Sequence, residues 1–397
     1  MPVASENAGP LADLLVLDLT RALAGPHAAM MLGDLGARVI KIEPPAGDDT
    51  RSWGPPFVGP EDARESTYFL SANRNKESLV LDLKDEADKD VLARLVERAD
   101  VLMENYRTGV LDRLGFPVER LHQLNPRLVV LSITGFGHDG PEGSRAGYDQ
   151  IAQGEGGLMS LTGAARPTKV GVPIADLLAG MNGAFGVLAA LHEREQTGCG
   201  RVVRTSLLAG MVGVHAFQGT KWTVAGEAPG LAGDHHPSIA PYGLFATATA
   251  PIQIACGSEG LWRALCGALG LDPAEEGLAT NPERVAHRDD LVDKLERLFA
   301  AQSAEHWLAL LADAGVPSGK VRSLDDVYAW EQTRSQGLLL AVEHPTLGPI
   351  ELPGSPLRFD ENAYSGGRPS HDAPPTLGQH NASIRAWLAS ETARTDL

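Results

Sequence analysis

Short apolar runs alternate with amphipathic segments along the first part of the chain, and this alternation predicts strands separated by helices. Five runs have strand length: LLVLDL, RVIKIEP, SLVLDL, DVLMEN and RLVVLSIT. Between the first two, Pro26 marks a helix start and Gly36 a C-terminal cap. The segment DEADKDVLARLVERAD places Val91, Leu92 and Leu95 on one helical face. The pattern predicts an α/β fold with a Rossmann-like parallel sheet and helices on both faces.

The composition of the sequence changes after the fifth predicted strand. Residues 135–171 are rich in glycine and are predicted to form loops, whereas residues 176–195 predict a long helix rich in Ala and Gly. Residues 225–325 contain one strand-like run, PIQIACG, and three amphipathic segments, which predict a smaller α/β domain. We therefore divide the chain into 1–224, 225–325 and 326–397.

The composition is that of a soluble globular protein, with 43% hydrophobic and 21% charged residues. A net charge of −17 disfavours general nucleic-acid binding but leaves room for a small anionic ligand. Three sparse cysteines favour a reducing compartment. Because no Cys-x-x-Cys motif is present, the sequence suggests neither a zinc site nor a thioredoxin-type site. The most apolar stretch, Leu177–Leu191, is shorter than the roughly 20 residues that span a bilayer. With no secretory signal at the N-terminus, we expect a cytoplasmic protein without nucleic-acid or membrane partners.

One segment, GFGHDG at 135–140, fits the glycine fingerprint of dinucleotide-binding proteins. That fingerprint must open a helix, but Pro141 and Gly143 follow at once, so we favour a glycine-rich active-site loop and expect no nicotinamide. His235 and His236 are adjacent, which points their side chains to opposite faces of a strand, and no third ligand has a suitable spacing. No metal is therefore expected.

A carboxylate is the most informative candidate for chemistry. Asp176 follows an apolar run and stands at the start of the predicted Ala- and Gly-rich helix. The ordinary explanation is an N-cap, where a side-chain oxygen accepts a free helix N–H. Asp149 and Asp49 compete by the same standard, so the residues alone do not single out a nucleophile.

Five long blocks, in order along the chain, resemble the class III CoA-transferases, the family of formyl-CoA transferase, carnitine CoA-transferase and α-methylacyl-CoA racemase. They include LDLTRALAGPHAAMMLGDLGARVIKIEPP, ADVLMENYRTGVLDRLG and VGVPIADLLAGMNGAFGVLAALHEREQTGCGR. The run GDDTRSWGPPF is most similar to the succinate–hydroxymethylglutarate branch. The resemblance implies a large domain assembled from both ends of the chain, a smaller domain, and two subunits interlocked as a homodimer.

The same resemblance makes Asp176 the catalytic nucleophile of a CoA transfer. Its carboxylate would attack the thioester of a donor, succinyl-CoA or another dicarboxylyl-CoA, to give a mixed anhydride and then an aspartyl-CoA thioester, from which a free acid takes the CoA. The CoA thioester is a co-substrate, and the implied chemistry needs no metal or nicotinamide. Backbone N–H groups near Gly135 and Gly137, or near Tyr242 and Gly243, would stabilise the oxyanions.

The resemblance also assigns residues of the CoA site, position by position. Asn105, Tyr106 and Arg113 match positions that line it, and the guanidinium of Arg113 suits a phosphate. Formyl-CoA transferase has an arginine that contacts a CoA phosphate where this chain has Pro44, in IKIEPP. The resemblance therefore implies that Arg74 or Lys76 supplies this phosphate contact.

Further positions bear on substrate choice. Leu23 stands where formyl-CoA transferase has a glutamine, and Tyr148 stands where the racemases carry a histidine base. A phenol with an ordinary pKa of about 10 is a poor base at neutral pH, which favours transfer over racemisation. Arg21, ahead of Arg51 and Arg74, is the candidate for a distal carboxylate. The alternatives are an acyl-CoA racemase and a non-catalytic CoA-ester-binding protein, the latter disfavoured by the intact nucleophile motif.

Overall fold

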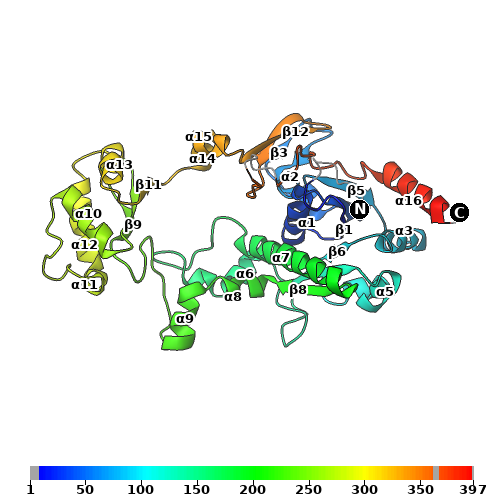
Figure 1. Ribbon diagram of the computed structural model, residues 1–397, viewed down its shortest axis with the longest axis horizontal. Coiled ribbons are helices and arrows are strands. Elements are labelled where there is room, and N and C mark those ends of the chain that lie inside the picture. Colours follow the sequence, from blue (N-terminus) through cyan, green and yellow to red (C-terminus); the bar gives the residue numbers. More distant parts are fainter. Residues whose placement is uncertain (1–8, 361–365, 396–397) are drawn as a thin grey trace. The chain divides into compact units, whose positions relative to one another are not determined.

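The computed structural model describes residues 9–360 and 366–395, which form two compact units (Figure 1). The larger, here called the main unit, is built from three separate stretches of the chain, and the smaller unit from two. The main unit comprises Met1–Leu158, Val170–Thr220 and Trp330–Leu397, and the smaller unit Met159–Lys169 and Lys221–Ala329. The domain boundaries taken from the sequence stay a prediction beside this division.

A six-stranded parallel sheet with the order β5-β2-β1-β6-β7-β8 forms the centre of the main unit. Numbered along the chain, this order is 3-2-1-4-5-6, the order of the Rossmann fold, and it confirms the predicted fold class. The direction of winding reverses between β1 and β6, which opens a crevice at their carboxyl ends. The strands are β1 (Leu15–Asp18), β2 (Arg38–Glu43), β5 (Lys76–Val80), β6 (Val101–Glu104), β7 (Val129–Thr134) and β8 (Val202–Ser206).

Both faces of the sheet are covered by helices, as predicted. Alternate residues of each strand point to opposite faces, so that Val16 joins one core cluster while Leu15 and Leu17 join the other. The first cluster lies under α1 (Ala24–Asp34) and α7 (Ile174–Thr197). The second lies under α3 (Glu86–Val96), α5 (Val118–Leu124) and α16 (Asn381–Thr395), which brings the last described helix of the chain back onto the sheet.

The Ala- and Gly-rich helix α7 lies directly against α1. A Cβ on Gly180 would stand 2.4 Å from the carbonyl oxygen of Ala24, and one on Gly183 would stand 2.9 Å from Cδ2 of Leu131. Real Cβ atoms do not approach other atoms so closely, so only glycine allows α7 to reach the first turn of α1 and the sheet below. This contact places the start of α7, with Asp176, beside the start of α1.

By length and composition, α7 is the one described helix that would suffice to cross a membrane. The core helix of a soluble protein meets the same criterion, and α7 packs on α1, α8 (Leu207–Gly213), β7 and β8. Its apolar character therefore follows from packing within the main unit.

The smaller unit pairs a three-stranded antiparallel sheet, in the order β11-β10-β9, with a group of helices. Its core contains Phe245, Trp262 and Phe299, all essentially buried. The strands are β9 (Tyr242–Phe245), β10 (Ile252–Ala255) and β11 (Ser318–Lys320), and the helices are α10 (Glu259–Leu269), α11 (Asn281–Ala286), α12 (Arg288–Phe299), α13 (Ala304–Asp313) and α14 (Leu324–Ala329).

Within the glycine-rich segment 135–171, predicted as loops, the structure contains the helix α6 (Asp149–Glu155). Ala152 and Gln153 of this helix are buried. A short helix therefore forms in a segment whose glycine content predicted loops. The remaining elements are η1 (Asp49–Ser52), β3 (Phe57–Val58), β4 (Glu65–Ser66), α2 (Thr67–Ser71), α4 (Val110–Arg113), η2 (Leu158–Ser160), α9 (Ala216–Ala225), α15 (Glu331–Ser335), β12 (Leu339–His344) and β13 (Gly348–Pro353).

A buried ion pair ties α1 to the segment before β5. Nε and Nη2 of Arg74 donate to the two carboxylate oxygens of Asp34 at 2.8 and 2.5 Å, and both side chains are almost completely buried. The third nitrogen, Nη1, donates to the carbonyl oxygen of Pro353 at 2.8 Å. Arg74 therefore links three parts of the main unit.

Replacing Arg74 with alanine should lower the free energy of unfolding by about 3–5 kcal/mol, because it leaves the Asp34 carboxylate buried without its cation. Urea unfolding measures this loss. In the control Arg334→Ala, which breaks the half-exposed pair with Glu351, the expected loss is below about 1 kcal/mol. Equal losses in the two variants would contradict a structural role for the buried pair.

Candidate active site

A cavity of about 210 Å³ opens at the carboxyl ends of β1 and β6, where the winding of the sheet reverses. Ligands bind at this position in open parallel sheets. Its walls come from the segments that follow these strands, 21–24 and 105–108, and from the segment 143–148 that precedes α6. Asp176, on the first turn of α7, also lines the cavity.

Asp176 carries the most unusual carboxyl group of this cavity. Burial, and after it the negative charge of Asp149, raises the pKa of Asp176 to about 7. No described residue donates a hydrogen bond to its carboxylate, and no cation is paired with it. A buried carboxylate without a partner is costly, which is why such groups are found at functional sites.

The N-terminus of α7 is capped by Asp149 and not by Asp176. Oδ1 of Asp149 accepts hydrogen bonds from the backbone N–H groups of Ala175 at 2.8 Å and Asp176 at 3.4 Å. Oδ2 accepts from the side chain of the buried Gln153 at 2.8 Å. The N-cap residue itself, Pro173, offers no side-chain bond. The capping role that the sequence allowed for Asp176 is thus filled from α6, and the carboxylate of Asp176 stays available for chemistry.

The wall formed by residues 21–24 is held by the loop after β6. The backbone N–H of Arg21 donates to Oδ1 of Asn105 at 2.8 Å, and Nδ2 of Asn105 donates back to the carbonyl oxygen of Arg21 at 2.7 Å. The guanidinium of Arg21 stands 5.6 Å from the ring centre of Tyr106 and pairs with Asp49 at 3.3 Å. This half-exposed cation faces the cavity from the same wall.

Two aromatic residues near the cavity escaped the sequence analysis. Trp53 lines the cavity, and its ring meets that of Tyr68 edge-on at 5.0 Å. Burial, and after it the charges of Asp176, Asp149 and Asp48, raises the pKa of Tyr68 to about 12. Trp53 belongs to the run GDDTRSWGPPF, which carries the family resemblance but gave no role for this residue. Trp53 and Tyr68 lie far from Asp176 in sequence, so only the fold brings them to this place.

The structure brings about half of the predicted site residues to this cavity. Besides Asp176, the predicted residues that line it are Arg21, Leu23, Asn105, Tyr106, Gly135 and Tyr148. Ala22, Ala24, Asp49, Trp53, Arg107 and Arg145 line it as well and were not predicted. Arg107 follows the predicted pair Asn105–Tyr106 directly, so extending that motif by one residue would have included it.

The other predicted residues do not line this cavity. Arg51 is bound to both carboxylate oxygens of Glu43 at 2.7 Å, and Lys76 is buried against Asp18 at 2.8 Å. Arg74 is buried in its pair with Asp34, the α4 residue Arg113 is exposed, and Gly137 does not line the cavity. Tyr242 and Gly243 line a separate cavity of about 720 Å³ within the smaller unit.

The glycines around residue 135 allow two backbone segments to pack closely. A Cβ on Gly135 would stand 2.7 Å from Cα of Gly147, so two glycines are needed for the loop after β7 to touch the segment before α6. Turns, and not a helix, follow GFGHDG, so the helix that a dinucleotide fingerprint requires does not form. Among the described residues no group of three or more His, Cys, Asp or Glu side chains is placed to hold a metal ion.

Comparison with known proteins identifies the family. The model of CoA-transferase family III matches residues 11–381. Acetyl-CoA:oxalate CoA-transferase of Acetobacter aceti is 39% identical, with 97% of each chain covered. Succinyl-CoA:glutarate CoA-transferase of Homo sapiens is 38% identical, covering 95% of this chain and 86% of the relative. A crystal structure of a CAIB/BAIF family protein from Brucella suis superposes with a TM-score of 0.84 at 39% identity, covering 96% of this chain and 100% of that one.

The chain therefore belongs to family III of the CoA-transferases. It is a CoA-transferase, an enzyme that uses CoA thioesters as co-substrates. The resemblance inferred from its sequence motifs is confirmed.

The raised pKa of Asp176 predicts how the reaction depends on pH. A carboxylate attacks only when it is deprotonated, so kcat/KM should fall as the pH drops through about 7. Asp149→Asn removes a neighbouring negative charge while an amide oxygen can still accept the N–H of Ala175, so the inflection should move to lower pH. The pH–rate profiles of the two proteins measure this shift, and coincident profiles would contradict the electrostatic coupling.

Proposed function

We propose that this enzyme transfers CoA from a dicarboxylyl-CoA, such as succinyl-CoA, to a free dicarboxylic acid through Asp176. The single observation that carries the proposal is the half-buried, unpaired carboxyl of Asp176 in a cavity at the switch point of the sheet. The names of the relatives, which include oxalate, glutarate and succinyl-CoA, support dicarboxylates as the substrate class.

The proposed chemistry divides one difficult exchange into steps on one side chain. A carboxylate oxygen of Asp176 attacks the thioester carbon of the donor, the C–S bond breaks, and CoA leaves as a thiolate. The thiolate attacks the Asp176 carbonyl of the mixed anhydride, which forms an aspartyl-CoA thioester and releases the donor acid. The acceptor carboxylate then repeats both steps in reverse order. No water and no net proton are consumed, so a site that excludes water favours transfer over hydrolysis.

Each step passes through an oxyanion, and the start of α1 offers donors for it. The N-cap residue Leu23 makes no side-chain capping bond, so the first N–H groups of α1 are uncapped at a cavity-lining segment. Ala24 lies at this point and is brought towards α7 by its contact with Gly180. Backbone N–H groups at a helix N-terminus favour negative charge through both hydrogen bonding and the helix dipole.

The distal carboxylate of a dicarboxylic substrate would find a cation in the same cavity. Arg21 lines the cavity, its side chain is 45% exposed, and its partner Asp49 is still more exposed. Such an open pair contributes little by itself and can exchange one carboxylate for another. We assign the distal carboxylate to Arg21.

Racemisation is the less favoured alternative. It requires a second acid–base group, and at the position of the racemase histidine this chain carries Tyr148, which is 67% exposed. No histidine lines the cavity within the part of the chain that the structure describes. These observations support transfer.

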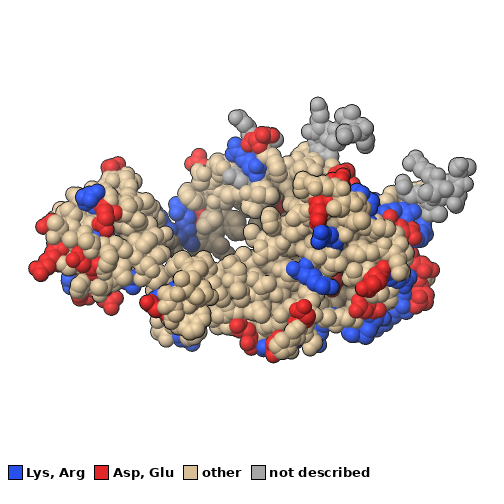
Figure 2. Space-filling view, turned by 60° about the horizontal axis from the view of Figure 1, so that its bottom comes forward, with Lys and Arg blue, Asp and Glu red and all other residues tan. Residues whose placement is uncertain are grey.

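We propose in addition that the enzyme acts as a homodimer. The outer faces of α7 and α8 carry large apolar side chains that are exposed in the single chain, among them Met181 at 48%, Phe185 at 75% and Val212 at 56%. Figure 2 shows broad uncharged areas on the surface of the protein between its charged side chains. Clustered exposed apolar residues mark interaction surfaces, and a second copy of the chain is the partner that the family resemblance implies.

The nucleophile can be tested by trapping its acyl intermediate. Wild-type enzyme incubated with succinyl-CoA should give a hydroxylamine-sensitive adduct on the peptide that contains Asp176, detected by mass spectrometry. Asp176→Asn should form no adduct and lose at least about 10³-fold in transfer rate, because the attacking oxygen is gone, while circular dichroism shows an intact fold. Transfer at the wild-type rate by Asp176→Asn, or an adduct on Asp149, would overturn the assignment.

The dimer predicts a specific effect of a charge on α7. Phe185→Glu should shift the protein to a monomer in analytical ultracentrifugation, because it places a carboxylate within an apolar interface. Leu324→Glu is the matched control, since this residue is 74% exposed but belongs to α14 of the smaller unit. A wild-type protein that sediments as a monomer would refute the proposal.

A further inference from the structure

The wall of the cavity contains an alanine in a conformation that alanine avoids. Ala22 has a φ of 63°, in the left-handed region where a Cβ is unfavourable. It lies between the end of β1 and the start of α1, and it lines the cavity. Strained residues of this kind persist only where their surroundings impose the conformation, and they gather at functional sites. The groups that hold Ala22 therefore bear on the shape of the site.

The peptide groups on both sides of Arg21, which Asn105 binds through the N–H and the carbonyl oxygen of Arg21, are also bound by a buried ion pair. Nζ of Lys41 donates to the carbonyl oxygen of Thr20 at 3.0 Å, and Oδ1 of Asp48 accepts from the backbone N–H of Ala22 at 3.3 Å. Lys41 and Asp48 pair with each other at 2.8 Å, with essentially no exposed side-chain surface. The turn that ends β1 is thus bracketed by the two halves of one ion pair.

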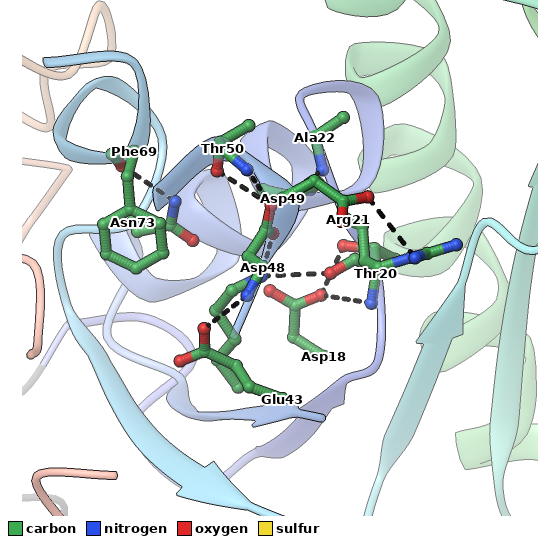
Figure 3. Close-up of polar contacts among 12 residues, drawn as sticks. Asp18, Thr20, Arg21, Ala22, Glu43, Asp48, Asp49, Thr50, Phe69 and Asn73 are labelled. Atoms are coloured by element: carbon green, nitrogen blue, oxygen red, sulfur yellow. Dashed lines mark hydrogen bonds and ion pairs between the residues drawn. The ribbon is translucent and has the colours of Figure 1, made fainter. Parts of the chain in front are cut away.

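Asp48 is itself fixed from several directions. Its Oδ1 also accepts from the backbone N–H of Thr50 at 2.9 Å and from the Thr50 hydroxyl at 2.8 Å, and its own N–H donates to Oε2 of Glu43 at 3.0 Å (Figure 3). Burial alone would raise the pKa of Asp48, but the charge of Lys41 and the hydrogen bonds from Lys41 and Thr50 hold it below its ordinary value. The carboxylate is therefore charged and immobile at neutral pH, as a positioning group must be.

Only Leu23 lies between Ala22, in its left-handed conformation, and Ala24, the first residue of α1. Leu23 and Ala24 follow Ala22 directly, and the uncapped N–H groups of α1 begin there. A rotation of the peptide after Ala22 would turn these groups relative to Asp176 on α7. The buried pair therefore acts on the reaction through backbone geometry and not through contact with the substrate.

We propose that Lys41 and Asp48 form a positioning pair that imposes the left-handed conformation of Ala22 and thereby aims the first N–H groups of α1 at the reacting carbonyl. This inference rests on the proposed transfer through Asp176. If the Lys41–Asp48 pair served stability alone, breaking it would lower the melting temperature. Catalysis would then not depend on the conformation of residue 22.

Glycine at position 22 provides the test, because glycine adopts positive φ without strain. Asp48→Asn should lower kcat by about 10- to 100-fold, with KM changed less than about threefold, since displaced donors act on the transition state. Adding Ala22→Gly to Asp48→Asn should restore kcat at least about fivefold without restoring the melting temperature to the same extent.

Ala216→Gly is the matched control, because Ala216 is also an alanine at positive φ, 47°, but lies outside the cavity. Combined with Asp48→Asn, it should give no recovery of kcat. Recovery by both glycines, or by neither, would refute the positioning role.

A second variant covers the case in which Asp48→Asn does not fold. Ala22→Val leaves the ion pair intact but puts a branched side chain at positive φ, where it is strongly disfavoured, and should lower kcat at least about tenfold. Unchanged kcat in Ala22→Val would overturn the inference. If Asp176→Asn retains full transfer, the proposed function fails, whereas loss of transfer in Asp176→Asn without rescue at position 22 refutes the positioning pair alone.

Discussion

The close approach of α7 to α1 is the contact on which the catalytic cavity depends. The Rossmann order opens a crevice at the ends of β1 and β6, but the proposed nucleophile is carried by α7, which begins 150 residues after Ala24 in the first wall of that crevice. Gly180 lets the backbone of α7 lie against the carbonyl of Ala24. A larger residue would separate the helices and move Asp176 away from the N-terminus of α1, so one missing side chain brings the proposed nucleophile and the proposed oxyanion donors together.

The acidic groups around this contact divide into two kinds. Asp18 and Asp48 are buried beside Lys76 and Lys41, and although burial favours their neutral forms, the lysines lower both pKa values below the ordinary range. Asp176 is half-buried without a cation, and its pKa rises to about 7. The first kind fixes the backbone of the cavity wall. In the proposed mechanism the second supplies the attacking carboxylate, so stability is lost at the proposed nucleophile while the neighbouring pairs keep the wall in place.

Local sequence was sufficient for β1, β2, β5, β6 and β7, whose predicting runs are dominated by Leu, Val and Ile, and for α3, which has a clear amphipathic period. The edge strand β8 was missed because most of its residues are only half-buried and its Val202–Ser206 sequence includes Arg and Thr. The helix α6 was missed because the glycines on both sides of it dominate the local composition. Exposure and flanking composition explain both failures.

For the site, the sequence alone determined the fold class, the family and Asp176 as the residue to examine, because these rest on local patterns and long motifs. It left open whether Asp176 caps its helix, since a cap is recognised by which side chain reaches the free N–H groups, and here Asp149 reaches them from another helix. Only the tertiary structure showed that Arg51, Arg74 and Lys76 do not line the cavity, because each is paired with a carboxylate of another segment of the main unit. Charge pairing and burial are properties of the folded chain, and residue type does not reveal them.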